Sequence, residues 1–242
     1  SSSGAQGMEP KARTYKYFDF VMVAFVVVLV CSNLIGPAKA AQIDLPLIGA
    51  VTFGAGVLFF PISYIFGDIL TEVYGYSRAR RVIWTGFAAL AFAALMAAVV
   101  VALPPAPTWE NQKVYEIAFG NTWRIAGASM IAYFCGEFVN SYVLAKMKIA
   151  TEGRYVRTRF VASTVAGEAV DSTIFYPLAF WNSGIMPNEL VLTLVVSQFV
   201  TKTFVEIAFL PVTTRIVTAL KKAENEDHYD RDTDFNPFTL KV

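Results

Sequence analysis

Eight ionisable side chains lie in, or directly beside, segments that are otherwise apolar enough to span a membrane. They are Asp19, Asp68, Glu72, Glu137, Glu168, Asp171, Lys202 and Glu206. A charged side chain near the centre of a bilayer costs about 2.5–3.5 kcal/mol on insertion scales, so such residues usually pair, face a polar cavity or line a solute or proton path. The sequence therefore indicates a membrane protein with a polar interior, and a transporter is the first hypothesis.

The spacing of these residues places several of them on shared helix faces. Glu168 and Asp171 are three residues apart, and residues three or four apart in a helix lie on one face. The same spacing occurs in three further groups: Gln198, Lys202 and Glu206; Tyr64, Asp68 and Glu72; and Glu137 with Asn140 and Ser141. We therefore expect several helices to present polar stripes to a common interior.

A short pattern of glycine followed by an acid recurs in three of the apolar segments. It occurs as Gly67-Asp68, Gly136-Glu137 and Gly167-Glu168. Glycine beside the acid would let a neighbouring backbone or a ligand come close, because glycine has no side chain. The pattern is weak evidence for a shared cavity.

Positive charge to balance these acids is scarce. Lys202 could pair with Glu206 in its own helix, or with Asp171 across the bundle, and so have a purely structural role. One lysine cannot neutralise all the buried acids, and ionised carboxylates only accept hydrogen bonds. The excess therefore favours a solute that is rich in N–H donors or positively charged. Phe175, one helical turn after Asp171, could stack on a planar heteroaromatic solute, although most phenylalanines in such a chain face lipid.

The residues predicted to bind the solute come from five of the apolar segments. They are Glu137, Asn140, Glu168, Asp171, Phe175, Gln198, Lys202, Glu206, Asp68, Glu72 and Asn33.

Composition supports a membrane protein and disfavours several other classes. The 242 residues are 55% hydrophobic and 16% charged, whereas soluble domains have about 25% charged residues. The net charge of +1 argues against nucleic-acid binding. The two cysteines, Cys31 and Cys135, and the one histidine, His228, do not have metal-ligand spacing, so we expect no metal and no cofactor.

Six segments have the length and apolarity of a spanning helix, about 20 residues. They are Phe18–Ile35, Leu47–Phe66, Val82–Leu103, Ile125–Met147, Phe160–Trp181 and Leu190–Val212. Basic residues cluster before the first segment, after the sixth and in alternate connections: Lys11, Arg13 and Lys16; Arg78, Arg80 and Arg81; Lys146, Lys148, Arg154, Arg157 and Arg159; and Arg215, Lys221 and Lys222. Because basic loops stay in the cytoplasm, the sequence predicts an all-α, multi-pass protein with six transmembrane helices and both termini cytoplasmic.

The chain divides into three parts. Residues 1–14 are interpreted as a cloning remnant and a disordered N-terminus, residues 15–222 as the six-helix domain, and residues 223–242 as a polar cytoplasmic tail lying loosely on the surface. The run of small residues from Gly86 to Ala94 is typical of close helix packing in lipid, and is interpreted as a packing feature and not a site.

One long motif resembles a known family. The run from Pro61 to Trp84, which contains Phe66-Gly67-Asp68-Ile69-Leu70-Thr71-Glu72-Val73-Tyr74-Gly75, resembles the signature of the queuosine precursor transporter family, also known as the vitamin uptake transporter family. The resemblance continues through Gly136–Ser141, the Arg157–Phe160 approach to Gly167–Ser172, and Phe175-Tyr176-Pro177. It covers most of the chain from the first predicted span to the sixth.

The resemblance implies an importer in the bacterial inner membrane. Its expected solutes are the precursors of the modified tRNA base queuosine: 7-cyano-7-deazaguanine, 7-aminomethyl-7-deazaguanine or queuine. The guanine-like edge of these molecules presents adjacent N–H donors that suit a carboxylate. The expected partners are this solute and the lipid bilayer, with no nucleic acid, and a homodimer is left open.

The energy source and the function class have alternatives. The family is thought to be related to the six-helix substrate-binding subunits of energy-coupling-factor importers. The chain lacks a Walker-type nucleotide loop, so it is either a self-sufficient transporter or, alternatively, such a subunit for a vitamin-like heteroaromatic solute. An intramembrane aspartyl hydrolase is disfavoured because Asp68 lacks the glycine–x–glycine–aspartate pattern, so no enzymatic activity is expected. A passive channel remains a further alternative.

Overall fold

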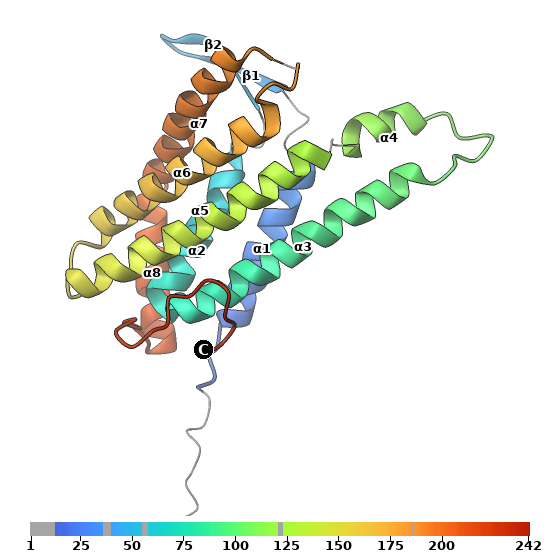
Figure 1. Cartoon of the computed structure of the whole chain (residues 1–242). Coiled ribbons are helices and arrows are strands. Elements are labelled where there is room, and N and C mark those ends of the chain that lie inside the picture. Colours follow the sequence, from blue (N-terminus) through green and yellow to red (C-terminus); the bar gives the residue numbers. More distant parts are fainter. Residues whose placement is uncertain (1–12, 36–39, 55–57, 121–122, 185) are drawn as a thin grey trace, which may run out of the picture.

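The computed structural model describes residues 13–35, 40–54, 58–120, 123–184 and 186–242, and over these residues the chain is mostly helical (Figure 1). Its elements in order are α1 (Phe18–Ile35), β1 (Ala40–Leu45), β2 (Gly49–Gly54), α2 (Phe60–Tyr74), α3 (Tyr76–Ala102), α4 (Gln112–Phe119), α5 (Trp123–Ala150), α6 (Val156–Phe180), α7 (Asn188–Ala208) and α8 (Leu210–Glu224). Residues 1–12 of the expected N-terminal remnant, which include Lys11 of the first basic cluster, lie outside the described residues.

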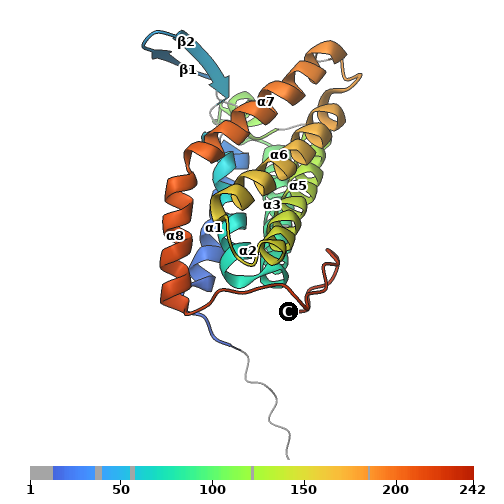
Figure 2. The ribbon, with the colours of Figure 1, turned by 90° about the vertical axis from the view of Figure 1, so that its left-hand side faces the viewer.

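The long helices run between two ends of a bundle. Helices α1, α2, α3, α5 and α6 alternate in direction, and α7 with α8 completes the last pass (Figure 1). The start of α1 and the end of α8 meet at one end, where the Arg13 guanidinium donates to the carbonyl of Glu224 at 3.0 Å. The β1–β2 hairpin and α4 lie at the opposite end (Figures 1 and 2).

The expectation of an all-α chain is wrong at residues 40–54. The segment predicted as the helix Leu47–Phe66 contains β2, which pairs with β1 in an antiparallel register from Ala40↔Gly54 to Leu45↔Gly49. Gly49 has a φ of 87° and sits at the turn, where a left-handed conformation is needed. The helix α2 begins only at Phe60, with a proline in its first turn that favours helix initiation. Apolar composition alone did not separate the hairpin from the helix.

The last predicted span is also divided. Helix α7 ends at Ala208 and α8 begins at Leu210, so the expected segment Leu190–Val212 is not one continuous helix. Pro211 has no backbone N–H to donate to the carbonyl of Ile207, which interrupts the helical ladder at this point. Figure 2 shows the change of direction between α7 and α8. By contrast, α1 has the predicted bounds, and α3, α5 and α6 differ from the predicted segments at their ends.

Exposed and buried residues are distributed as in a membrane protein. Three of the described helices, α1, α3 and α7, are long and apolar enough to cross a membrane by length and composition. Their outward residues include Phe20, Val23, Phe92, Val99, Val196 and Phe204, each more than half exposed. Acids, amides and hydroxyls are instead buried between the helices. Because lipid solvates apolar side chains and water does not, this inverted pattern fits a bilayer.

The sequence suggested that the C-terminal segment lies loosely on the surface, but in the structure this segment is docked against the bundle. The Arg80 guanidinium donates to the carbonyls of Asp234, Asn236 and Lys241 at 2.7 Å each. The Asp230 carboxylate accepts from the backbone N–H of Tyr76 at 3.0 Å. Burial alone would raise the pKa of Asp230, but hydrogen bonds from His228, Thr233 and the Tyr76 amide outweigh burial and hold this pKa below its usual range. The tail therefore covers the end of the bundle at which α2 meets α3.

Candidate functional site

Five acidic side chains from four helices are buried in the interior of the bundle. Asp68 comes from α2, Glu137 from α5, Glu168 and Asp171 from α6, and Glu206 from α7. None of the five is more than 3% exposed. Lys202, one turn before Glu206 on α7, lies close enough to Asp171, Glu168 and Glu206 to interact with their charges. The structure thus brings together acids that the sequence could only assign to separate helices.

The glycines beside the acids explain this convergence. A Cβ on Gly167 would lie 3.0 Å from the carbonyl oxygen of Gly136, so α5 and α6 approach too closely here for any side chain. A Cβ on Gly136 would meet the Tyr64 hydroxyl, and one on Gly67 would lie 2.5 Å from a carboxylate oxygen of Glu137. The recurrent glycine–acid pattern is therefore a packing device: each glycine makes room for a neighbouring helix or polar side chain, and its acid is held at the junction.

Two of the five acids have a hydrogen-bond donor and three do not. The Tyr64 hydroxyl donates to Asp171 at 2.9 Å, and the Asn140 amide donates to Asp68 at 2.8 Å. Among the described residues, no donor forms a well-aligned hydrogen bond with the carboxylate oxygens of Glu137, Glu168 or Glu206, although the hydroxyls of Ser63 and Thr164 lie near Glu137 and Glu206. Buried polar atoms are usually satisfied, because leaving them without a partner costs free energy. Such exceptions point to a ligand, a proton or a change of conformation.

Lys202 is placed as a shared counterion. Its ammonium lies 4.7 Å from the centre of the Phe60 ring, at the start of α2. It is buried together with the acids of α6 and α7 and pairs with none of them at salt-bridge distance. The predicted internal pair of Lys202 with Glu206 or Asp171 is thus a longer-range electrostatic interaction in this arrangement.

A cavity of about 450 Å³ opens between α1, α3, α4 and α5, toward the end of the bundle that carries α4. Its polar groups include Asn33, Ser129 and Glu116, and its aromatic groups include Phe119, Trp123 and Phe175. The Ser129 hydroxyl donates to the Asn33 side chain at 3.1 Å. Its size falls within the usual range of small-molecule pockets. Two predicted solute residues, Asn33 and Phe175, line this cavity.

The small residues of α3 need a corrected interpretation. Gly86 serves close packing, since a Cβ there would crowd Tyr133, Leu29 and Phe25. Further along the helix, however, Ala93 and Ala94 line the cavity, and Ala97 and Ala98 continue this wall. The run predicted to be only a packing feature therefore also shapes the cavity.

The acids and the cavity are neighbouring but separate. Glu137, Glu168 and Asp171 do not line the cavity, which reaches α6 at Phe175. Phe175 is one helical turn from Asp171, so the same helix joins the cavity to the acids. The Phe175 ring also packs edge-on against Tyr176, with 4.9 Å between the ring centres. The aromatic turn of α6 thus lies between the buried acids and this cavity, which we call the outer cavity because it opens toward the α4 end of the bundle.

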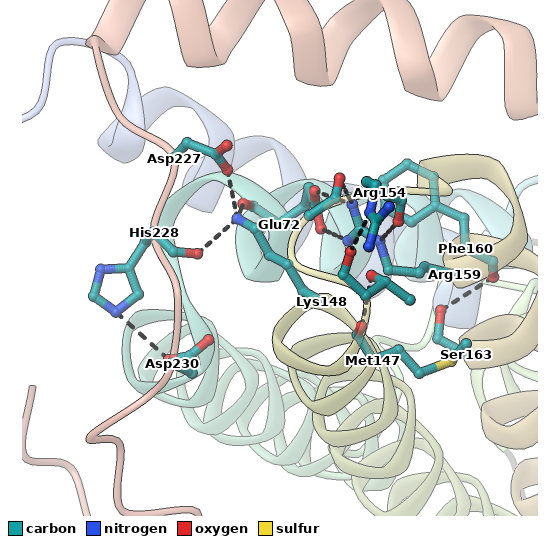
Figure 3. A network of polar contacts seen from close by, with 12 residues as sticks. Glu72, Met147, Lys148, Arg154, Arg159, Phe160, Ser163, Asp227, His228 and Asp230 are labelled. Carbon is teal, nitrogen blue, oxygen red and sulfur yellow. Dashed lines mark hydrogen bonds and ion pairs between the residues drawn. The ribbon is translucent and has the colours of Figure 1, made fainter.

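Glu72 lies apart from these acids in a fully paired network. Its carboxylate accepts from Arg159 at 2.5 and 3.0 Å and from Lys221 at 2.8 Å. Lys148 donates to the Glu72 carbonyl, to Asp227 and to the His228 carbonyl (Figure 3). The network joins α2, α5, α6, α8 and the tail, so it closes the end of the bundle where the two described chain ends meet.

The remaining predicted site residues, Asn140 and Gln198, differ in burial. Asn140 is buried, and its side-chain amide oxygen Oδ1 has no partner among the described residues. Gln198 is only half-buried, although it shares the stripe of Lys202 and Glu206. Sequence reasoning did not include Tyr64 or Ser129 among the site residues. Tyr64 had a signal, its four-residue spacing from Asp68, whereas Ser129 had none.

Comparisons with known proteins agree with this architecture. The family model for vitamin uptake transporters matches residues 54–216. The "Probable queuosine precursor transporter" of Bacillus subtilis (strain 168) is 29% identical over 193 residues, which cover 79% of this chain and 80% of that protein. The "Queuosine precursor transporter" of Escherichia coli (strain K12) is 26% identical over 175 residues, which cover 72% and 73%. No solved structure matches the chain.

Proposed function

Because the chain belongs to the vitamin uptake transporter family and is therefore a membrane transport protein and not an enzyme, we propose that it imports queuosine precursors across the bacterial inner membrane. The proposed solutes are 7-cyano-7-deazaguanine, 7-aminomethyl-7-deazaguanine and queuine. The support for this solute class is the names of the two relatives and the chemistry of the interior. The observation that carries the proposal is the set of buried carboxylates without donors beside an aromatic cavity.

The two parts of the interior suggest successive positions of the solute. The outer cavity accepts the flat bicyclic ring, with Phe175 and Trp123 as stacking surfaces and Asn33 as a polar contact. When the helices part, the N–H edge of the guanine-like ring meets an acidic wall of Glu137, Glu168 and Asp171. Asn140 and Gln198 supply neutral contacts at this level. Carboxylates accept paired N–H donors well, which favours guanine-like rings over rings that present acceptors.

Reconstituted uptake tests this function. Purified protein in proteoliposomes should exchange labelled 7-cyano-7-deazaguanine saturably without ATP, and unlabelled deazaguanines should compete whereas thymine should not. A substrate-binding subunit of an energy-coupling-factor importer would bind the solute and move it only when an ATPase and its coupling subunit are supplied. A passive channel would give uptake that does not saturate. Absence of both binding and exchange would refute the solute assignment.

The same proposal includes six membrane passes with both termini in the cytoplasm. It is supported by the alternating helices and by the contact between Arg13 and Glu224, which joins the segment before α1 to the end of α8. Cysteines introduced at Glu110 and Asn182 should react with an impermeant thiol reagent added to intact cells. Cysteines at Arg154 and Arg231 should react only after the membrane is opened. Labelling of Arg231→Cys from outside would contradict this topology.

A further inference from the structure

We propose that Glu206 is a proton-binding site that couples solute import to the proton gradient across the membrane. The proposal rests on the proposed function for the identity of the solute that moves with the proton. It assigns to Glu206 a role distinct from that of the acids on α6, which bind the solute. In each cycle a proton from the outer side joins a carboxylate oxygen of Glu206, and the neutral acid later releases it to cytoplasmic water.

The burial of Glu206 is the first argument. Its side chain is almost fully enclosed, and no described residue donates to either carboxylate oxygen with good hydrogen-bond geometry, although the Thr164 hydroxyl lies near. Glu72 shows the contrast, because its equally buried carboxylate is held by Arg159 and Lys221. Ionised groups removed from water without such partners are strongly destabilised. A carboxyl group in the position of Glu206 avoids this cost by holding a proton.

The surrounding charges are the second argument. Glu168 from α6, Asp68 from α2 and Glu137 from α5 all lie near enough to repel a negative charge on Glu206. The Thr164 hydroxyl on α6 is near enough to donate weakly to Glu206, but it brings no positive charge. On α8, Lys221 is engaged by Glu72 and Asp227. Lys202, on the same helix as Glu206, is shared with Asp171 and Glu168. An ionised Glu206 would therefore face more like charge than opposite charge while the interior is closed.

Sharing of Lys202 provides the coupling. While Glu206 is neutral, the lysine interacts with Asp171 and Glu168, the acids that we assign to the solute. When Glu206 loses its proton, its charge competes for Lys202 from one helical turn away. Loss of the proton therefore changes the electrostatic state of the solute site, and by linkage the solute changes the proton affinity of Glu206.

The position of Glu206 along the chain also suits this role. It lies three residues before Phe209, where α7 ends and α8 turns away (Figure 2). Because Pro211 has no backbone N–H, the helical hydrogen bonds are interrupted at this junction. A change of charge at Glu206 thus occurs next to the break between α7 and α8.

Infrared spectroscopy tests the proton site without any solute. The full chain in lipid vesicles should show, at neutral pH, the C=O stretch of protonated carboxyl groups that shifts in D₂O. This band should weaken in Glu206→Gln and remain unchanged in Glu189→Gln, a control at the exposed start of the same helix. A band that Glu206→Gln leaves unchanged would refute the proposal, because Glu206 would then be ionised.

Transport measurements test the coupling. Proteoliposomes that are acidic outside should accumulate 7-cyano-7-deazaguanine, and an internal pH dye should report proton entry that requires the solute. Glu206→Gln should exchange solute across the membrane but lose accumulation driven by the pH gradient at least tenfold. Glu206→Asp, which keeps a carboxyl group, should retain accumulation, and so should Glu189→Gln.

The outcomes separate this proposal from the proposed function. Two results would overturn the proposal of proton coupling but not the proposed transport function. They are wild-type accumulation that does not depend on the pH gradient, and full accumulation by Glu206→Gln. If the wild-type protein exchanges no deazaguanine but Glu206→Gln still loses infrared intensity, the solute assignment fails and the proton site stands. If Glu206→Gln does not fold, Glu206→Asp replaces it, and a changed pH dependence of its accumulation would support the assignment. A wild-type dye signal without proton entry would overturn the proposal whatever the variants do.

Discussion

Asp171→Asn is expected to bind 7-cyano-7-deazaguanine roughly ten- to a hundredfold more weakly than the parent protein. The loss of a hydrogen bond to a charged group is worth about 1.5–3 kcal/mol, which gives this range of affinity. The substitution keeps the shape of the side chain, and its carbonyl can still accept from Tyr64, so the fold should be retained. Half of the acceptor surface, however, becomes an N–H donor that opposes the N–H edge of the solute. Calorimetry or equilibrium binding on purified protein measures the change.

Two further variants and a control make this result specific. Glu137→Gln and Glu168→Gln should weaken binding in the same direction, because no described residue holds either acid in a well-aligned hydrogen bond. Tyr74→Phe removes a hydroxyl that lies 3.4 Å from Glu224, away from the buried acids, and should change affinity much less. If all three acid variants fold and bind as tightly as the parent, the acids are structural and the solute is held elsewhere, most directly in the outer cavity.

Arg159→Met is expected to lower the free energy of unfolding by about 3–5 kcal/mol. Breaking a buried ion pair by removing one partner leaves an uncompensated charge, which accounts for the size of the effect. Arg159 and Glu72 both have side chains that are 0% exposed. Arg159 also donates to the carbonyls of Arg154 and Gly153, and these bonds would be lost as well. Lys221 still contacts Glu72, so the result should fall near the lower end of the range.

Denaturant unfolding in mixed micelles measures this change, with Arg157→Met as the matched control. Arg157 is exposed two residues away on the same helix, so its loss should have little effect. The double variant Glu72→Gln with Arg159→Met should recover part of the loss, because it removes the second buried charge. A single Arg159→Met protein as stable as the parent would mean that the network does not hold this end of the bundle together.

The sequence by itself was sufficient for the features that depend on local periodicity. Helix spacing predicted that Glu168 shares a face with Asp171, and that Lys202 shares one with Glu206, because residues three or four apart lie together in any helix. Hydrophobic length predicted α1 with its observed bounds. The motif around Asp68 indicated the family that the matching family model later identified. The glycine–acid pattern was visible but ambiguous, since it fitted both a close backbone and a ligand.

Only the tertiary structure decided which polar residues meet. Glu72 and Asp68 share a helix face, yet Glu72 is paired with Arg159, 87 positions away, whereas Asp68 joins the buried acids. The cavity likewise combines Asn33, Ala94 and Phe175, which are distant in sequence. The hairpin at Ala40–Gly54 was missed because apolar residues and β-branched residues suit both a membrane helix and a strand. Periodicity fixes the direction of a side chain about its own helix, but the packing of one helix against another determines what that side chain touches.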